Sequence, residues 1–174
     1  MSDYEYPYRP PGRRFRYVPG SDPIIRLAIR YARRFSRDPS MPNASVIVVG
    51  GKPVAAGANG SDYHRLHGCR RRSGGSETGQ DYRLCAGCHP RNHSERRAVL
   101  HARERQVDIH GADLYLWGHF GCCEDCWRVL LAAGIRDVYL VEDAERLFNK
   151  RHPDNVIGSQ FEHFGLRPRD PGTG

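Results

Sequence analysis

"CCEDCWRVLLAAGIRDVYLVE", residues 122–142, carries clustered cysteines, a helix and a strand in immediate succession. Within it, "EDCWRVLLAAGI" (124–135) predicts a helix closed by Gly134, and "RDVYLVE" (136–142) predicts a strand. Just before it, "ADLYLWG" (112–118) predicts another strand. Two strands joined through a helix form a βαβ unit, so this stretch predicts an α/β domain.

The remaining segments add a hairpin and further helices. Asp22 is suited to cap a first helix and Pro23 to occupy its first turn. A Gly-Gly-Lys-Pro turn joins two apolar runs into a hairpin. The predicted elements are a helix over 21–35, two strands within 44–60, a helix over 93–106, a helix over 143–151 and a short element within 156–166. Together they predict a three-layer α/β/α fold with a mixed central sheet of about five strands.

Length and composition fit one globular domain. The chain has 174 residues, of which 39% are apolar. No apolar run is long enough to cross a membrane, and the N-terminus has no apolar leader, so we expect a cytoplasmic protein with no membrane contact. In that reducing compartment, six cysteines indicate metal binding rather than disulfides. The net charge of +7 favours phosphate-bearing partners, from a nucleotide to a nucleic acid.

Three segments show no helical or strand period. Residues 1–20 are rich in Tyr, Arg, Pro and Gly and predict a surface tail, which is solvated, contacts another subunit, or stacks bases and meets phosphates. Residues 59–92 form a long insertion rich in Arg, Gly, Ser, His and Cys, and such a loop is normally functional or held by something other than apolar packing. Residues 169–174 are expected to be a C-terminal tail, which leaves 21–168 as the folded domain.

Four residues at the starts of two predicted helices carry the chemistry. His93 and Glu95 lie two apart, and Cys123 and Cys126 form a Cys-x-x-Cys at the next helix. A helix N-terminus favours thiolates, so both sulfurs can bind one zinc ion together with the imidazole. Three protein ligands leave a position for water, whose proton the carboxylate can accept. His-x-Glu followed by Cys-x-x-Cys is the established signature of zinc deaminases that act on cytosine or adenine.

Longer motifs around these residues resemble the cytidine and deoxycytidylate deaminase superfamily. They are "SVIVVGGKPVAAGANG" (45–60), "HSERRAV" (93–99) and "CCEDCWRVLLAAGIRDVYLVE" (122–142). The resemblance covers at least about residues 22–142. The length of the segment between Asn59 and His93 resembles that of the deoxycytidylate (dCMP) deaminases in particular.

The resemblance implies a homo-oligomeric, zinc-dependent hydrolytic deaminase. By position, it implies His93, Cys123 and Cys126 as zinc ligands, Glu95 as the proton shuttle and Asn59 as an amide that binds substrate near the sugar.

Three features depart from the pattern of that superfamily. Ser94 stands where Ala is usual, and Cys122 stands where Pro is usual. The connection "LWGHFG" (116–121) replaces a small polar stretch and is longer than usual. His119 and Phe120 in this connection either contact the base, or His119 is a solvated loop residue. The departures therefore concern the substrate rather than the metal.

The long insertion offers a second set of metal ligands. Three cysteines and one imidazole would close a tetrahedral structural zinc site and order a loop that has few apolar residues. Some deoxycytidylate deaminases hold a second zinc in this region, although free thiols are the alternative. The candidate ligands are Cys69, Cys85 and Cys88 together with His64, His67 or His89. His67 is preferred as the fourth ligand because it lies beside Cys69.

Three consecutive arginines, Arg70, Arg71 and Arg72, follow Cys69 directly. In a loop that faces the pocket they would clamp a nucleotide phosphate, and otherwise they are solvated charges.

The sequence therefore predicts a zinc-dependent deaminase that converts a cytosine-containing nucleotide, dCMP to dUMP, and releases ammonia. One alternative is a deaminase of cytosine or adenine in single-stranded DNA or RNA, for which the basic tail and the altered connection argue. The other is a zinc-stabilised nucleic-acid-binding module without catalysis, which would have no use for the carboxylate of Glu95.

Overall fold

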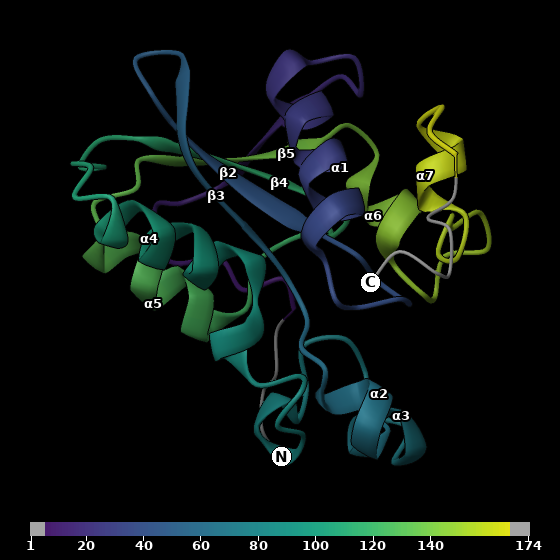
Figure 1. Cartoon of the computed structure of the whole chain (residues 1–174). Helices are drawn as coiled ribbons and strands as arrows, with labels where there is room; N and C mark the ends of the chain where they lie inside the picture. Colours follow the sequence, from purple (N-terminus) through teal and green to yellow (C-terminus); the bar gives the residue numbers. More distant parts are fainter. Residues whose placement is uncertain (1–5, 168–174) are drawn as a thin grey trace.

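The computed structural model describes residues 6–167, in which a five-stranded sheet lies between two helical layers (Figure 1). The strands are β1 (Phe15–Val18), β2 (Ala44–Val49), β3 (Lys52–Ala58), β4 (Asp113–Trp117) and β5 (Asp137–Val141). The longer helices are α1 (Pro23–Phe35), α4 (Ser94–Glu104) and α5 (Glu124–Ala132). The short ones are α2 (Tyr63–His67), α3 (Arg70–Ser73), α6 (Ala144–Phe148) and α7 (Gln160–His163), with single 3-10 turns at Tyr82–Leu84 and Pro90–Asn92.

The sheet is mixed and has the strand order β1-β5-β4-β2-β3. β5 pairs in parallel with both β1 and β4, whereas β2 pairs antiparallel with β3 and β4. The predicted βαβ unit and the predicted hairpin are therefore both present. α1 packs against β2, β3 and β4, while α4 and α5 lie side by side on the opposite face (Figure 1). The predicted three-layer α/β/α fold is confirmed.

The first helix begins as its sequence predicts. The Asp22 carboxylate accepts hydrogen bonds from the backbone N–H groups of Ile24 and Ile25, at 2.8 and 3.1 Å. Pro23 follows in the first turn, where its missing N–H group leaves no hydrogen bond unmade. α1 then ends at Phe35, so residues 36–43 lead directly to the rim of the pocket described below.

The N-terminal segment differs from the predicted surface tail. Residues 15–18 form β1 at the edge of the sheet, where Phe15 is buried against Trp127 while Arg16 and Tyr17 remain exposed. A four-residue edge strand is too short to show an alternating pattern of apolar and polar residues. Its arginine also made the segment resemble a solvated loop. Residues 1–5, and the predicted tail over 169–174, lie outside the described residues.

An aromatic cluster holds the last part of the described chain against the end of β4. Trp117, the final residue of β4, is completely buried and contacts the rings of Phe148, Phe161 and Phe164. The cluster fixes the point at which the chain leaves the sheet for the connection 118–121. None of the helices among residues 6–167 has the length and apolar character needed to cross a bilayer.

Candidate active site

The N-terminal ends of α4 and α5 bring His93, Cys123 and Cys126 together. His93 immediately precedes α4, Cys123 caps α5, and Cys126 lies in the first turn of α5. Nδ1 of His93 lies 3.6 Å from Sγ of Cys123 and 3.4 Å from Sγ of Cys126. The three potential ligand atoms all lie within 4.8 Å of one another. One imidazole nitrogen and two sulfurs, all converging on one point, fit a zinc ion.

The second ring nitrogen of His93 is also engaged. Nε2 lies 3.1 Å from the backbone carbonyl oxygen of Cys88, to which it donates a hydrogen bond. The ring edge also meets the ring of Tyr82, with 4.6 Å between centroids. Because the proton is held on Nε2, the lone pair of Nδ1 faces the two sulfurs, as a metal-binding histidine requires.

The thiols of Cys123 and Cys126 have pKa values that are shifted in opposite directions. A hydrogen bond from Cys126, together with the contact to His93, lowers the pKa of Cys123 to about 5 against the effect of burial. The pKa of Cys126 is raised well above its usual value, first because it donates that hydrogen bond and then because it is buried. The thiolate therefore forms first on Cys123, even without a metal ion.

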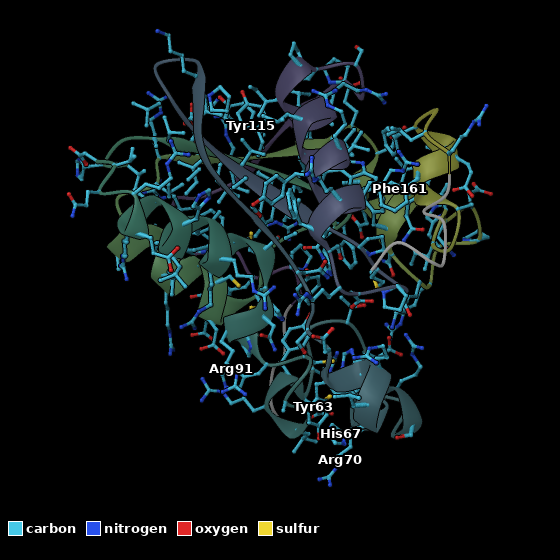
Figure 2. The ribbon with its side chains drawn as sticks, viewed as in Figure 1. Tyr63, His67, Arg70, Arg91, Tyr115 and Phe161 are labelled. Carbon is cyan, nitrogen blue, oxygen red and sulfur yellow. The ribbon has the colours of Figure 1, made fainter. Side chains whose placement is uncertain are left out.

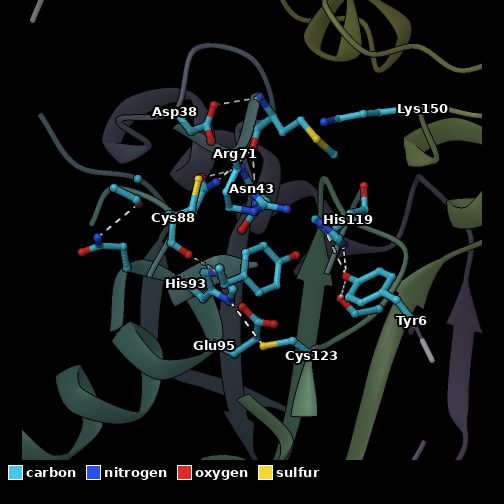
Figure 3. A pocket seen from close by; sticks show the side chains of 18 residues that line it. Tyr6, Asp38, Asn43, Arg71, Cys88, His93, Glu95, His119, Cys123 and Lys150 are labelled. Carbon is cyan, nitrogen blue, oxygen red and sulfur yellow. Dashed lines mark hydrogen bonds between the residues drawn. The ribbon is translucent and has the colours of Figure 1, made fainter. Parts of the chain in front are cut away.

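Glu95 lies at the floor of the same pocket and is 95% buried. Burial raises the pKa of its carboxyl group, and the electrostatic effect of the neighbouring His93 opposes that shift. Figure 3 shows the carboxylate between His93 and Cys123. A buried carboxyl group with a raised pKa, held next to three metal-ligand atoms, is suited to accept and return a proton.

Basic side chains line the same pocket away from Glu95. Arg71 donates hydrogen bonds to the backbone carbonyls of Gln80 and Glu77, at 2.6 and 2.7 Å, and its guanidinium lies 4.3 Å from the centroid of the Tyr82 ring. Lys150 also lines the pocket and forms no hydrogen bond or salt bridge with any residue between 6 and 167. In Figure 3, both cations stand at the end opposite Glu95 and Cys123.

Of the three predicted arginines, only Arg71 lines the pocket. Arg70 is exposed and points away from the body of the protein (Figure 2), and Arg72 is exposed and bonded to the Ser40 hydroxyl. The expectation for Arg70 and Arg72 is thus corrected, because consecutive residues of the short helix α3 cannot share one face. Sequence reasoning missed Lys150, which lies beyond α6 and outside every motif.

Asn59 lines the pocket, but the protein already uses most of its carboxamide. Oδ1 accepts hydrogen bonds from the Ser36 hydroxyl at 2.7 Å and the Asn43 N–H at 2.9 Å, and Nδ2 donates to the Met41 carbonyl at 2.9 Å. Asn59 therefore shapes the rim formed by residues 36–43 and keeps one N–H bond for a substrate.

His119 and Tyr6 form a further wall of the pocket. The Tyr6 hydroxyl lies 2.5 Å from Nδ1 of His119 and donates a hydrogen bond to the Gly121 carbonyl at 2.7 Å. Burial lowers the pKa of His119 to about 3, so the ring is neutral. His119 is thus a pocket residue rather than a solvated one. Tyr6 was missed because it lies in the segment that resembled a tail.

A second cluster joins His64, Cys69, Cys85 and Cys88, whose ligand atoms also lie within 4.8 Å of one another. Nε2 of His64 is 3.2 Å from Sγ of Cys85 and 3.4 Å from Sγ of Cys88, and the sulfurs of Cys69 and Cys88 are 3.5 Å apart. The imidazole packs directly over Gly87, where a Cβ atom would approach Nε2 to 2.4 Å. Glycine at position 87 is therefore required for this arrangement.

The fourth member of this cluster is His64, which corrects the sequence preference for His67. His67 is exposed at the far tip of the insertion (Figure 2), with its ring 4.7 Å from that of Tyr63. Both histidines lie on α2, but the His64 ring contacts the cysteine sulfurs whereas the His67 ring packs on Tyr63, and Gly68 then turns the chain with φ +69°. Closeness to Cys69 in the sequence was a poor guide.

A family model supplies the decisive comparison. Residues 21–142 match the model described as the cytidine and deoxycytidylate deaminase zinc-binding region. The chain belongs to the cytidine and deoxycytidylate deaminase family. It is accordingly a zinc-dependent deaminase, and its cofactor is Zn²⁺.

Two solved structures illustrate the similarity of this deaminase to known proteins. One is the dCMP deaminase from the cyanophage S-TIM5 in complex with dCMP and dUMP, with 21% identity over 84% of this chain and 96% of that chain, and a TM-score of 0.46. The other is a diaminohydroxyphosphoribosylaminopyrimidine deaminase/5-amino-6-(5-phosphoribosylamino)uracil reductase from Thermotoga maritima, with 19% identity over 83% of this chain and a TM-score of 0.43. The deaminase spans about a third of that protein, 34% of its length. The search of curated proteins found no match to the present chain.

The two single-residue departures from the deaminase pattern both lie against Glu95. The Ser94 hydroxyl donates to a Glu95 carboxylate oxygen at 3.2 Å and is 2.9 Å from the Ser45 hydroxyl. The Cys122 thiol is completely buried, and its proximity to Glu95 raises its pKa further, after the effect of burial. Cys122 is not part of the metal-ligand cluster. These residues therefore alter the surroundings of Glu95 and not the donor set.

Proposed function

We propose that this deaminase converts a cytosine-containing nucleotide to the uracil nucleotide, with dCMP as the substrate, and that His93, Cys123 and Cys126 hold the zinc ion. The observation that carries this proposal is the pocket itself. A buried carboxylate and a three-ligand cluster occupy its floor, and two cations stand at its other end. A catalytic group at one end of the pocket and positive charge at the other suit a substrate in which a base is attached to a phosphate.

Each residue has a definable task in this reaction. Zinc bound by three protein ligands would keep one position for a water molecule and make that water ionise near neutral pH. Glu95 would accept one proton from the water and deliver it to N3 of the cytosine ring. It would then take the second proton from the hydroxyl group added at C4 and give it to the amine, so that the C4–N bond breaks, ammonia leaves and the C4 carbonyl forms. His93 is held in the correct orientation by the Cys88 carbonyl. The Glu95 carboxylate lies between His93 and Cys123 (Figure 3), which suits both proton transfers.

Arg71 and Lys150 would bind the phosphate. Arg71 is fixed by two backbone carbonyls and by the Tyr82 ring, so little side-chain freedom remains to be lost on binding. Lys150 adds a second positive charge and forms no salt bridge or hydrogen bond with any residue between 6 and 167. The N-terminal segment also supports a free nucleotide over single-stranded nucleic acid as the substrate, because Tyr6 and β1 are engaged in the pocket wall and the sheet.

We further propose that His64, Cys69, Cys85 and Cys88 bind a second, structural zinc ion. Four ligands close a tetrahedral site and leave no position for substrate or water. All six cysteines are free thiols, and five of them belong to one of the two clusters, which suits a cytoplasmic location.

Mass spectrometry of the reaction tests the proposal. The zinc-loaded deaminase is incubated with dCMP, cytidine, dCTP, adenosine and a cytosine-containing single-stranded oligonucleotide. We expect dCMP to gain about one mass unit, because hydrolysis replaces an amino group with an oxygen atom. The gain should vanish in Glu95→Gln and persist in Glu124→Gln, a control at an exposed carboxylate of α5. Conversion of the oligonucleotide but not of dCMP would overturn the assignment of the substrate.

A further inference from the structure

The N-terminal residues Tyr6–Tyr8 lie directly against the connection that leads from β4 to the zinc cluster. The backbone N–H of Tyr8 donates to the Cys122 carbonyl at 3.1 Å. Pro7 packs so closely on Gly121 that a Cβ atom there would approach the proline ring to 2.2 Å. The Tyr6 ring meets the Phe120 ring edge-on, with 5.0 Å between centroids. A segment that precedes the family region therefore forms part of the pocket wall.

Counting protons defines the state of His119. The Tyr6 hydroxyl has one proton, which it donates to the Gly121 carbonyl at 2.7 Å. Its oxygen can then only accept from His119, whose Nδ1 is 2.5 Å away, whereas Nε2 is 3.4 Å away. Nδ1 therefore carries the N–H group, and the neutral ring keeps a lone pair on Nε2. Among residues 6–167 the Tyr6 hydroxyl contacts both ring nitrogens, and the Gly121 backbone also lies close enough to the ring to act on its pKa.

The position of this lone pair matters because His119 lines the pocket. Figure 3 shows Tyr6 and His119 together on one side, Cys88 and His93 on the other, and Glu95 with Cys123 between them. A substrate whose reacting carbon lies near Glu95 thus passes beside His119. His119 is half-buried, so a bound molecule would displace water from this lone pair, and that loss is costly unless the molecule supplies a donor.

We propose that Tyr6 is a positioning residue that holds His119 in the Nδ1–H form, so that Nε2 accepts a hydrogen bond from an N–H or O–H group of the substrate. The inference rests on the proposed nucleotide deamination and deepens it. In a cytosine nucleotide, the ring atoms N3 and O2 only accept hydrogen bonds. The donors are therefore the exocyclic amine and the sugar hydroxyl.

Binding measurements separate these two donors. Glu95→Gln in the zinc-loaded protein slows turnover about 10²- to 10⁴-fold, so calorimetry at short contact times can measure the Kd values of dCMP, dUMP and the 2′,3′-dideoxy analogue of dCMP. If the amine is the donor, adding Tyr6→Phe weakens dCMP about 3- to 10-fold, the value of one neutral hydrogen bond, and leaves dUMP unchanged. If the sugar hydroxyl is the donor, dCMP and dUMP weaken alike and the dideoxy analogue is unaffected.

A spectroscopic readout tests the positioning role without any nucleotide. Nitrogen-15 NMR of the histidine side chains should show the His119 proton on Nδ1 in the wild-type protein and a mixture of tautomers in Tyr6→Phe. Tyr8→Phe is the matched control, because Tyr8 belongs to the same segment but its hydroxyl has no hydrogen bond within the described chain. Equal zinc content and melting temperature in both variants would show that the fold is preserved.

A double variant completes the test. In a His119→Leu background, Tyr6→Phe should cause no further loss of nucleotide affinity, because the acceptor is already gone. Unchanged Kd values and an unchanged tautomer in Tyr6→Phe would overturn the inference while leaving the proposed function intact. Failure of the wild-type protein to bind any of the nucleotides would instead overturn the proposed function, and with it the substrate contact.

Discussion

The two Cys/His clusters of this deaminase use the same ligand chemistry in different settings. His93, Cys123 and Cys126 lie at the N-terminal ends of two packed helices, and both cysteines are buried. The members of the other cluster come from the insertion between β3 and α4, where only Cys85 is buried. Helices in the core can hold three ligands in place and leave the fourth position open, whereas a loop needs four ligands to be ordered at all.

The surroundings of the two clusters also differ, because one of them has an acidic side chain and a pocket beside it. A buried carboxylate, Glu95, lies beside the three-ligand cluster, and the pocket opens over it. The four-ligand cluster contains no carboxylate. Cys88 links the two, because its sulfur belongs to one cluster and its carbonyl oxygen holds the histidine of the other. The comparison supports the proposal that one cluster carries the chemistry and the other holds the structure around it.

The largest effect is expected from removing a ligand of the open site. Cys123→Ser should lose the zinc ion of that site and all measurable deamination, because the thiolate that forms first is gone. Zinc per chain should fall by one, while the loop zinc remains. Cys122→Ser is the matched control at the neighbouring buried thiol and should keep both metal ions. The ligand assignment would be wrong if Cys122→Ser lost zinc and Cys123→Ser did not.

Glu95→Gln should separate chemistry from metal binding. We expect kcat to fall about 10²- to 10⁴-fold, the usual contribution of a positioned acid or base, with both zinc ions retained. Steady-state kinetics and zinc analysis on the same preparation provide the measurement. A variant that retained wild-type kcat would show that another group moves the proton.

Removing a ligand of the closed site should weaken the open site indirectly. Cys85→Ser should lose the loop zinc and disorder the Cys88 carbonyl, which lowers zinc affinity at His93 about 10- to 100-fold, as for other outer-shell contacts. Competition with a chelator measures that affinity. Between the two histidines of α2, His64→Gln should resemble Cys85→Ser, and His67→Gln should resemble the wild type. The reverse result would restore His67 as the fourth ligand.

The last prediction concerns the pH dependence of stability rather than activity or metal binding. The pKa of His119 is lowered from its ordinary 6.5 to about 3 by burial, so between these values the unfolded chain binds more protons than the folded one. The free energy of unfolding should therefore rise with pH across that window. Urea unfolding of His119→Leu between about pH 4 and 6 should show a shallower rise, whereas the exposed His163→Gln should not. Equal slopes in His119→Leu and the wild type would contradict the burial of a neutral ring.

The sequence was most informative where residues close together in the chain are also close together in the fold. The βαβ unit, the hairpin and the residues gathered at the two helix starts follow from short-range patterns, because helix and strand periods fix neighbouring positions. His64 was misjudged because the partners of a loop ligand are decided by chain reversals such as Gly68. The contact between Cys88 and His93 uses a backbone carbonyl, which no residue type can signal.

The wall of the pocket was the least predictable part of the site. Tyr6 and Lys150 lie near opposite ends of the chain, far from any motif, and reach the pocket only through tertiary packing. Arg71 was indicated by its charge, but its separation from Arg70 and Arg72 depends on the direction of α3. Residues that touch the substrate can vary without affecting the fold, so they leave little pattern in one sequence.

Cobalt spectroscopy of the two clusters in isolation tests the difference between them most directly. Cys85→Ser retains only the open site and Cys123→Ser only the closed one, and Co²⁺ in place of zinc reports the ligands through its visible spectrum. We predict that a hydrated pyrimidine nucleotide, which mimics the transition state, changes the spectrum of Cys85→Ser and leaves that of Cys123→Ser unchanged. A spectrum of Cys85→Ser that does not respond to the nucleotide, or a response in Cys123→Ser, would contradict the assignment of catalysis to His93, Cys123 and Cys126.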